Sequence, residues 1–182
     1  MVLQQHLITF LLIIASSALV QGLGHIDLSV GNLLFLPLGA TLYVYLHFSQ
    51  KMLISVMLAN TVVGYFFWGN WSDNGLSGFF GHVVIGSLAP LMAIQVIKFL
   101  RLGQVQQGFW QRLFLLTLLT AIFNTLGKFF SFMDVLIEAI DPLLFLGSFM
   151  LGDILGCLVF VYLGEKFLTP VLKQRNLITL RY

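Results

Sequence analysis

The sequence predicts an all-α membrane protein, and three observations carry this prediction. Of the 182 residues, 59% are hydrophobic and only 9% are charged, whereas about a quarter of the residues in an ordinary soluble domain are charged. The hydrophobic residues gather in long stretches, and about 20 such residues are enough to cross a bilayer. Acidic and basic links alternate between these stretches. We therefore expect one transmembrane domain over residues 1–182, with six helices at about 7–23, 33–48, 52–69, 79–100, 109–132 and 143–163.

The first predicted helix, 7–23, contains the small-residue run Ala15-Ser16-Ser17-Ala18. Such a run is typical of the end of a signal peptide, but residues 1–6 contain no Lys or Arg. We therefore expect a retained helix.

The second predicted helix, 33–48, contains Pro37 and Gly39. Proline inside a helix removes a backbone hydrogen bond and kinks the helix, and the freed groups need partners inside the bundle. Two interpretations stay open, a packed kink and a broken helix that lines a cavity. Pro90 presents the same choice in the fourth helix, and there we expect the packed kink.

The last predicted helix, 143–163, carries an acid, Asp153, near its middle. An ionised carboxylate at that depth costs on the order of 2.5–3.5 kcal/mol on insertion scales, so it should face other helices, a polar cavity or a partner. Gly152 and Gly156 flank it, and small residues four apart let another backbone come close. This helix is therefore the expected functional or assembly helix.

Lys128, in the fifth predicted helix, is the other charge inside a span. In one interpretation Lys128 extends to the outer surface, while Asp153 accepts a hydrogen bond from a neighbouring Ser, Thr or Asn. In the other, a polar pocket opens to the outer side and takes a small-molecule ligand. Its lining would then be Asn60, Asn124, Lys128 and Asp153.

The placement of the charges predicts the orientation of the chain. Eight of the nine basic residues lie in or beside links 2–3 and 4–5, or after the sixth helix: Lys51, Lys98, Arg101, Arg112, Lys166, Lys173, Arg175 and Arg181. Five of the seven acids lie in the other links: Asp27, Asp73, Asp134, Glu138 and Asp141. The positive-inside rule then places both termini in the cytoplasm.

We predict no enzymatic activity, and neither a cofactor nor a metal. The chain contains no phosphate-binding glycine loop, no HExxH zinc helix and no serine nucleophile elbow. Its single cysteine, Cys157, excludes an internal disulfide and a Cys-rich metal site. The four histidines form no pair at similar depth, as haem ligation requires. No basic run indicates nucleic acid.

Two short segments resemble MASE1, a bacterial integral membrane sensor domain. Phe35-Leu36-Pro37-Leu38-Gly39-Ala40 is similar to that family's second helix, and Leu151-Gly152-Asp153-Ile154-Leu155-Gly156 is similar to its Gly-Asp-x-x-Gly element. The resemblance implies a sensing or docking role in the bacterial inner membrane, with Pro37, Gly39, Gly152, Asp153 and Gly156 as the matched positions. The family usually has more spans and is usually fused to an output domain, and both are missing here.

The size and topology also resemble the substrate-binding S-component of energy-coupling-factor vitamin transporters. Those proteins dock through an Ala-x-x-x-Ala face on their first span, whereas this chain offers Ala15 and Ala18, three apart. We therefore predict a non-catalytic inner-membrane sensor or accessory subunit that contacts lipids and acts through another membrane protein. A small-solute-binding transporter subunit and a structural subunit of a larger membrane complex are the alternatives.

Overall fold

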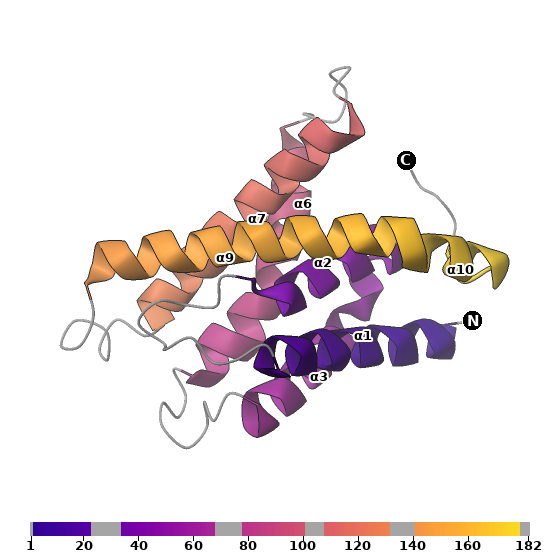
Figure 1. The fold of residues 1–182 in the computed structure, drawn as a ribbon, viewed down its shortest axis with the longest axis horizontal. Coiled ribbons are helices and arrows are strands. Elements are labelled where there is room, and N and C mark those ends of the chain that lie inside the picture. Colours follow the sequence, from indigo (N-terminus) through magenta and orange to yellow (C-terminus); the bar gives the residue numbers. More distant parts are fainter. Residues whose placement is uncertain (1, 23–33, 68–77, 101–107, 132–140, 179–182) are drawn as a thin grey trace.

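The computed structural model describes residues 2–22, 34–67, 78–100, 108–131 and 141–178, and these residues form helices and no β-strand. The all-α prediction is therefore confirmed for this part of the chain. The helices, shown in Figure 1, are α1 (Val2–Gly22), α2 (Leu36–Phe48), the 3₁₀-helix η1 (Gln50–Met52), α3 (Leu53–Phe66), the π-helix η2 (Phe80–Ile85), α6 (Gly86–Phe99), α7 (Phe109–Ser131), α9 (Pro142–Leu163), the π-helix η3 (Gly164–Leu168) and α10 (Thr169–Gln174).

Four helices are long and apolar enough to cross a membrane: Val2–Gly22, Gly81–Phe99, Phe109–Ser131 and Pro142–Gln174. This finding agrees with a multi-pass membrane protein. α2 and α3 have only 13 and 14 residues. At about 1.5 Å per residue each is roughly 20 Å long, which is less than the about 30 Å of a hydrocarbon core. Six full spans are therefore not confirmed.

The bundle carries apolar side chains outside and polar ones inside. Exposed large hydrophobic side chains occur on all four long helices, among them Leu7, Leu11, Met92, Phe114, Phe130, Leu143 and Leu151. Buried polar side chains include Thr9, Ser17, Ser87, Thr117, Asn124, Lys128 and Asp153. Extensive apolar surface marks contact with lipid or protein, so this arrangement suits a bilayer better than water.

α2 forms the centre of the bundle, where it contacts α1, α6 and α9. Every residue from Leu36 to Tyr45 is buried. Pro37 lies in the first turn of α2, where a missing N–H is harmless and the fixed φ favours helix initiation. Leu34 and Phe35 are not helical. The predicted kink inside 33–48 is therefore wrong, because the proline starts the helix.

α2 runs parallel to the second half of α9. At its start, Phe35 N donates to Gly152 O at 3.1 Å, in the middle of α9. At its end, His47 contacts Glu165, just beyond α9. α2 therefore begins about halfway along a predicted membrane-spanning helix.

α7 and α9 are antiparallel neighbours, as their short link predicts. The rings of Trp110 and Tyr162 lie 5.9 Å apart at one end of the pair. The rings of Phe129 and Phe145 lie 6.1 Å apart at the other. The pairing brings the polar residues of α7 beside the middle of α9.

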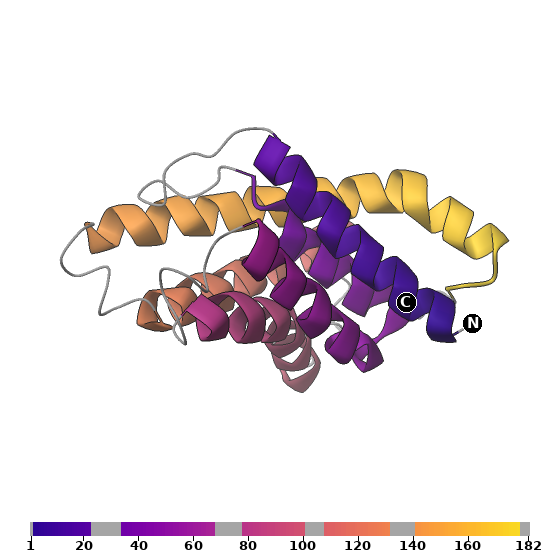
Figure 2. The same cartoon turned by 90° about the horizontal axis from the view of Figure 1, so that it is seen from below.

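Both described chain ends lie at one end of the bundle, here called the terminal end (Figures 1 and 2). Gln5 Nε2 of α1 donates to Leu177 O at 2.6 Å, and His6 of α1 contacts Ser55 at the start of α3 at 2.6 Å. The end of α6 reaches η1 there through a hydrogen bond from Gln95 to Gln50. Successive helices therefore alternate in direction.

The described basic residues other than Lys128 lie on elements at this terminal end: Lys51, Lys98, Arg112, Lys166, Lys173 and Arg175. Arg101, Arg181 and four of the link acids (Asp27, Asp73, Asp134 and Glu138) lie outside the described residues. Asp141 lies at the opposite end, where its side chain accepts a hydrogen bond from Leu143 N and caps α9.

Pro90 lies inside α6, and the helix continues through it. A proline cannot donate to the carbonyl four residues earlier, which here belongs to Gly86, where the π-helix η2 passes into α6. Pro90 and Gly86 are both buried. Pro90 is therefore packed inside the bundle as expected, but Gly86 also lines the cavity described below, so the choice between a packed kink and a break beside a cavity stays open.

Candidate functional site

The glycines of α9 bring the start of α2 against the middle of that helix. A Cβ atom added to Gly156 would lie 2.4 Å from the backbone carbonyl of Phe35. A Cβ atom added to Gly39 would lie 2.6 Å from Gly156 O. The close approach predicted for Gly152 and Gly156 is therefore present, but the partner is α2 of the same chain.

Asp153 points into the bundle and is only 1% exposed. Its Oδ2 accepts hydrogen bonds from Asn124 Nδ2 at 2.8 Å and from Thr125 Oγ1 at 3.1 Å, both on α7. The prediction that Asp153 accepts a hydrogen bond from a neighbouring Thr or Asn is confirmed. Hydrogen bonds to a charged acceptor are among the stronger ones, so this contact fixes the register of α7 against α9.

Lys128, one turn after Asn124, is also buried, with 5% of its side chain exposed. The predicted extension of Lys128 to the outer surface is therefore wrong. Its Nζ lies 4.2 Å from the centre of the Phe35 ring and 5.6 Å from that of Phe149. Within the described residues, Lys128 forms no ion pair with Asp153 and donates no hydrogen bond.

A small cavity lies beside Lys128, at the start of α2. The volume open to the centre of a water molecule is about 10 Å³, so the cavity has room for about one water. The lining residues come from α2, α3, η2, α6 and α7 and from the segment before α2: Phe35, Pro37, Leu38, Thr41, Asn60, His82, Gly86 and Lys128. Irregular backbone at membrane depth is tolerated where it lines a cavity, and Phe35 fits that rule.

The structure sorts the eight predicted site residues into three neighbouring groups. Pro37, Asn60 and Lys128 line the cavity. Asn124 and Asp153 form the hydrogen-bonded pair beside it. Gly39, Gly152 and Gly156 belong to the contact between α2 and α9. Asn60 and Lys128 line the cavity and Asn124 and Asp153 lie next to it, so a ligand pocket lined by all four residues stays a prediction.

Five further residues line the cavity that were not predicted as site residues: Phe35, Leu38, Thr41, His82 and Gly86. Phe35 and Thr41 look like ordinary residues of an apolar span. His82 is 8% exposed and lines the cavity with Lys128. In the sequence, only the neighbouring Pro37 indicated irregular backbone at this place, because proline often interrupts or begins a helix.

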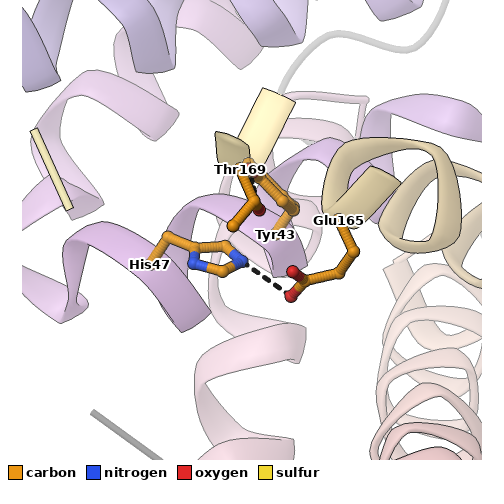
Figure 3. A network of polar contacts seen from close by, with 4 residues as sticks. All are labelled: Tyr43, His47, Glu165 and Thr169. Atoms are coloured by element: carbon orange, nitrogen blue, oxygen red, sulfur yellow. Dashed lines mark hydrogen bonds and ion pairs between the residues drawn. The ribbon is translucent and has the colours of Figure 1, made fainter. Parts of the chain in front are cut away.

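A second polar cluster lies at the terminal end, between α2 and η3 (Figure 3). His47 Nε2 lies 3.0 Å from Glu165 Oε1, and the Tyr43 hydroxyl lies 2.9 Å from Thr169 Oγ1. The rings of Tyr43 and His47 lie 4.3 Å apart. His47 is 2% and Glu165 22% exposed at the side chain. No sequence signal joins residues more than a hundred positions apart, so this cluster was not predicted.

Gly164 makes room for this second cluster. A Cβ atom at Gly164 would lie 2.7 Å from the ring of Tyr43. The π-helix η3 begins at this residue, and such segments often occur at functional sites. Within the described residues no group of three or more His, Cys, Asp or Glu is placed to hold a metal ion.

The chain matches no family model, and comparisons with curated proteins and with solved structures also find no match. The resemblance to MASE1 therefore stays a prediction. The case for a function rests on the geometry of the chain itself.

Proposed function

We propose that the protein is a non-catalytic sensor or accessory subunit of a bacterial inner membrane that binds a small polar ligand inside its helical bundle. The observation that carries this proposal is the cavity beside Lys128. Burying an ammonium group without a hydrogen-bond acceptor is expensive. A purely structural bundle would be more stable with an apolar side chain there, so a ligand that supplies the acceptor explains the residue better.

We also propose that both termini lie in the cytoplasm and that the chain crosses the membrane six times, with the short helices α2 and α3 making two of these passes. The positive-inside rule supports it, because the basic residues gather at the terminal end. The start of α2 opens away from that end, since its last turn lies at His47 and Glu165. We therefore propose that the ligand enters from the outer side.

The MASE1 resemblance supports a sensing role. Its two matched segments are far apart in the sequence, yet Phe35 of the first contacts Gly152 and Gly156 of the second. A ligand at the start of α2 would therefore act on the contact between both segments. We propose that the signal passes to a partner chain in the membrane.

A small-solute-binding transporter subunit is the second candidate. Ala15 and Ala18 are both exposed on α1, where an S-component-like docking face would be needed. A structural role in a larger complex was expected because Gly152 and Gly156 could admit the backbone of another chain. Phe35, at the start of α2 in the same chain, already contacts both glycines.

Ligand binding can be tested on the purified protein in mild detergent. The midpoint temperature of unfolding would be measured with a panel of small polar solutes that accept hydrogen bonds, namely chloride, acetate and glycine. We expect at least one solute to raise the midpoint of the wild type but not of Lys128→Met. Lys98→Met, which removes an exposed charge, is the matched control. If no solute distinguishes wild type from Lys128→Met, the proposal is wrong.

The partner can be tested by copurification from the native membrane. A kinase or cyclase would support the sensor, and an ATPase pair would support the transporter subunit. If the chain purifies without any other membrane protein, the accessory role is wrong.

A further inference from the structure

The cavity beside Lys128 has a charge pattern that narrows the class of its ligand. On the assumption that this cavity binds a ligand as proposed above, we infer that the ligand is a small monovalent anion of about the size of fluoride or chloride. Four features support this ligand class: the hydrogen-bonding state of Lys128, the direction of α2, a lining whose described residues include no acid, and the size of the space.

Lys128 supplies donors that nothing in the described chain accepts. An ammonium group has three N–H donors and no acceptor. The Phe35 ring at 4.2 Å attracts the positive charge, but it takes none of these hydrogen bonds. Only 5% of Lys128 is exposed, so bulk water does not fully solvate its ammonium group.

The first turn of α2 adds positive potential to the same space. Pro37 and Leu38 line the cavity, and no side chain caps this helix N-terminus. A helix N-terminus carries roughly half a positive charge and is suited to bind anions. Interrupted membrane helices often direct such N-termini at anionic groups. α2 begins within the bundle and not at its surface, so water screens this potential little.

Of the acids in the described part of the chain, none lines the cavity, although one lies nearby. The nearest described carboxylate, Asp153, accepts hydrogen bonds from Asn124 and Thr125 and is absent from the lining. Its negative charge offsets part of the Lys128 charge. We therefore expect weak binding, with half-saturation in the millimolar range.

The size of the cavity limits the anion. Room for about one water favours the smallest anions over phosphate, sulfate, a nucleotide and a lipid headgroup. The amide of Asn60 and the ring of His82 also line the space and offer polar contacts. Among anions, a monatomic one is nearest in size to the single water for which the space has room.

The experiment measures chloride binding to the full chain in detergent micelles. The ³⁵Cl NMR line width and the midpoint temperature of unfolding would be followed as sodium chloride replaces sodium gluconate at constant ionic strength. We expect saturable line broadening and a higher midpoint in the wild type, at least about tenfold weaker binding in Lys128→Met, and unchanged binding in Lys98→Met.

Asp153→Asn gives a test with the opposite sign, and it keeps the inference falsifiable if Lys128→Met fails to fold. Removing the nearby negative charge should strengthen chloride binding about threefold to tenfold. A merely structural role for Asp153 would weaken binding or leave it unchanged, and either result overturns the inference. Equal effects of chloride and gluconate in the wild type would also overturn it. If another solute of the panel then binds in a Lys128-dependent way, the proposed function survives and only the anion is wrong.

Discussion

The two ends of α2 carry two polar clusters that differ in how completely their hydrogen bonds are matched. At the terminal end, His47 contacts Glu165 and Tyr43 contacts Thr169, so each group has a partner. At the start of α2, Lys128 has an aromatic neighbour but no hydrogen-bond acceptor among the residues that the structure describes, and a cavity lies beside it. Fully satisfied polar networks rigidify a structure, whereas a buried polar group left unsatisfied calls for an explanation such as a bound water or ion. We therefore interpret the first cluster as a structural clamp and propose the second as a binding site.

The largest loss of stability should come from disrupting the contact between Gly156 of α9 and Phe35 at the start of α2, because this contact positions both clusters. Gly156→Ala would place its Cβ 2.4 Å from the Phe35 backbone, and backbone cannot yield as a side chain can. We expect destabilisation of about 3 kcal/mol or loss of folded protein. Gly147→Ala, where a Cβ meets nothing within 4 Å, is the control. Unfolding in mixed micelles would measure both, and equal stability of the two variants would contradict the fold.

The next largest effect concerns the carboxylate beside the cavity. Asn124→Leu removes a donor from the buried Asp153 Oδ2. A buried charged group that loses a hydrogen bond costs about 1–3 kcal/mol, so we expect a loss near 2 kcal/mol in the free energy of unfolding. Leu126→Ala, on an exposed face of α7, should change it by less than half as much. A smaller loss for Asn124→Leu than for Leu126→Ala would contradict the role given to this contact.

A double-mutant cycle tests the clamp at the terminal end. His47→Gln and Glu165→Gln should show a coupling energy of about 0.5–1.5 kcal/mol, because the His47 ring is buried against the Glu165 carboxylate. Chloride binding should remain as in the wild type in all three variants. A coupling energy of zero would contradict a stabilising contact between His47 and Glu165. A loss of chloride binding would contradict the independence of the two clusters.

The smallest effect should come from one hydroxyl. Tyr43→Phe removes the hydrogen bond to Thr169, and such bonds in membrane proteins average about 0.6 kcal/mol. Tyr162→Phe changes an exposed tyrosine and should have no measurable effect. If Tyr43→Phe is equally silent, the Tyr43–Thr169 contact adds nothing to the clamp.

The sequence predicted the parts of this fold that depend on local composition. The apolar stretches located the helices, the charge of Asp153 predicted its inward direction, and Gly152 with Gly156 predicted a close backbone contact. The sequence did not predict which backbone would come close, because that depends on packing between segments far apart in the chain.

Two features could not be read from hydrophobicity. Leu34 and Phe35 are as apolar as the helix that follows them, so hydropathy does not reveal that α2 begins only at Leu36. Lys128 can extend far enough to reach water from many positions, so its burial against Phe35 depends on where α2 begins. The contact of His47 with Glu165 likewise depends on the tertiary fold.

The central claim is that the space between Lys128 and the start of α2 holds a ligand. Long-wavelength anomalous diffraction from crystals of the wild-type protein grown in sodium chloride tests it by locating bound chloride. The account predicts an anomalous peak within contact distance of Lys128 Nζ, near Pro37 and Leu38. A cavity without a peak, together with a direct hydrogen bond from Lys128 to the Asp153 carboxylate, would contradict it.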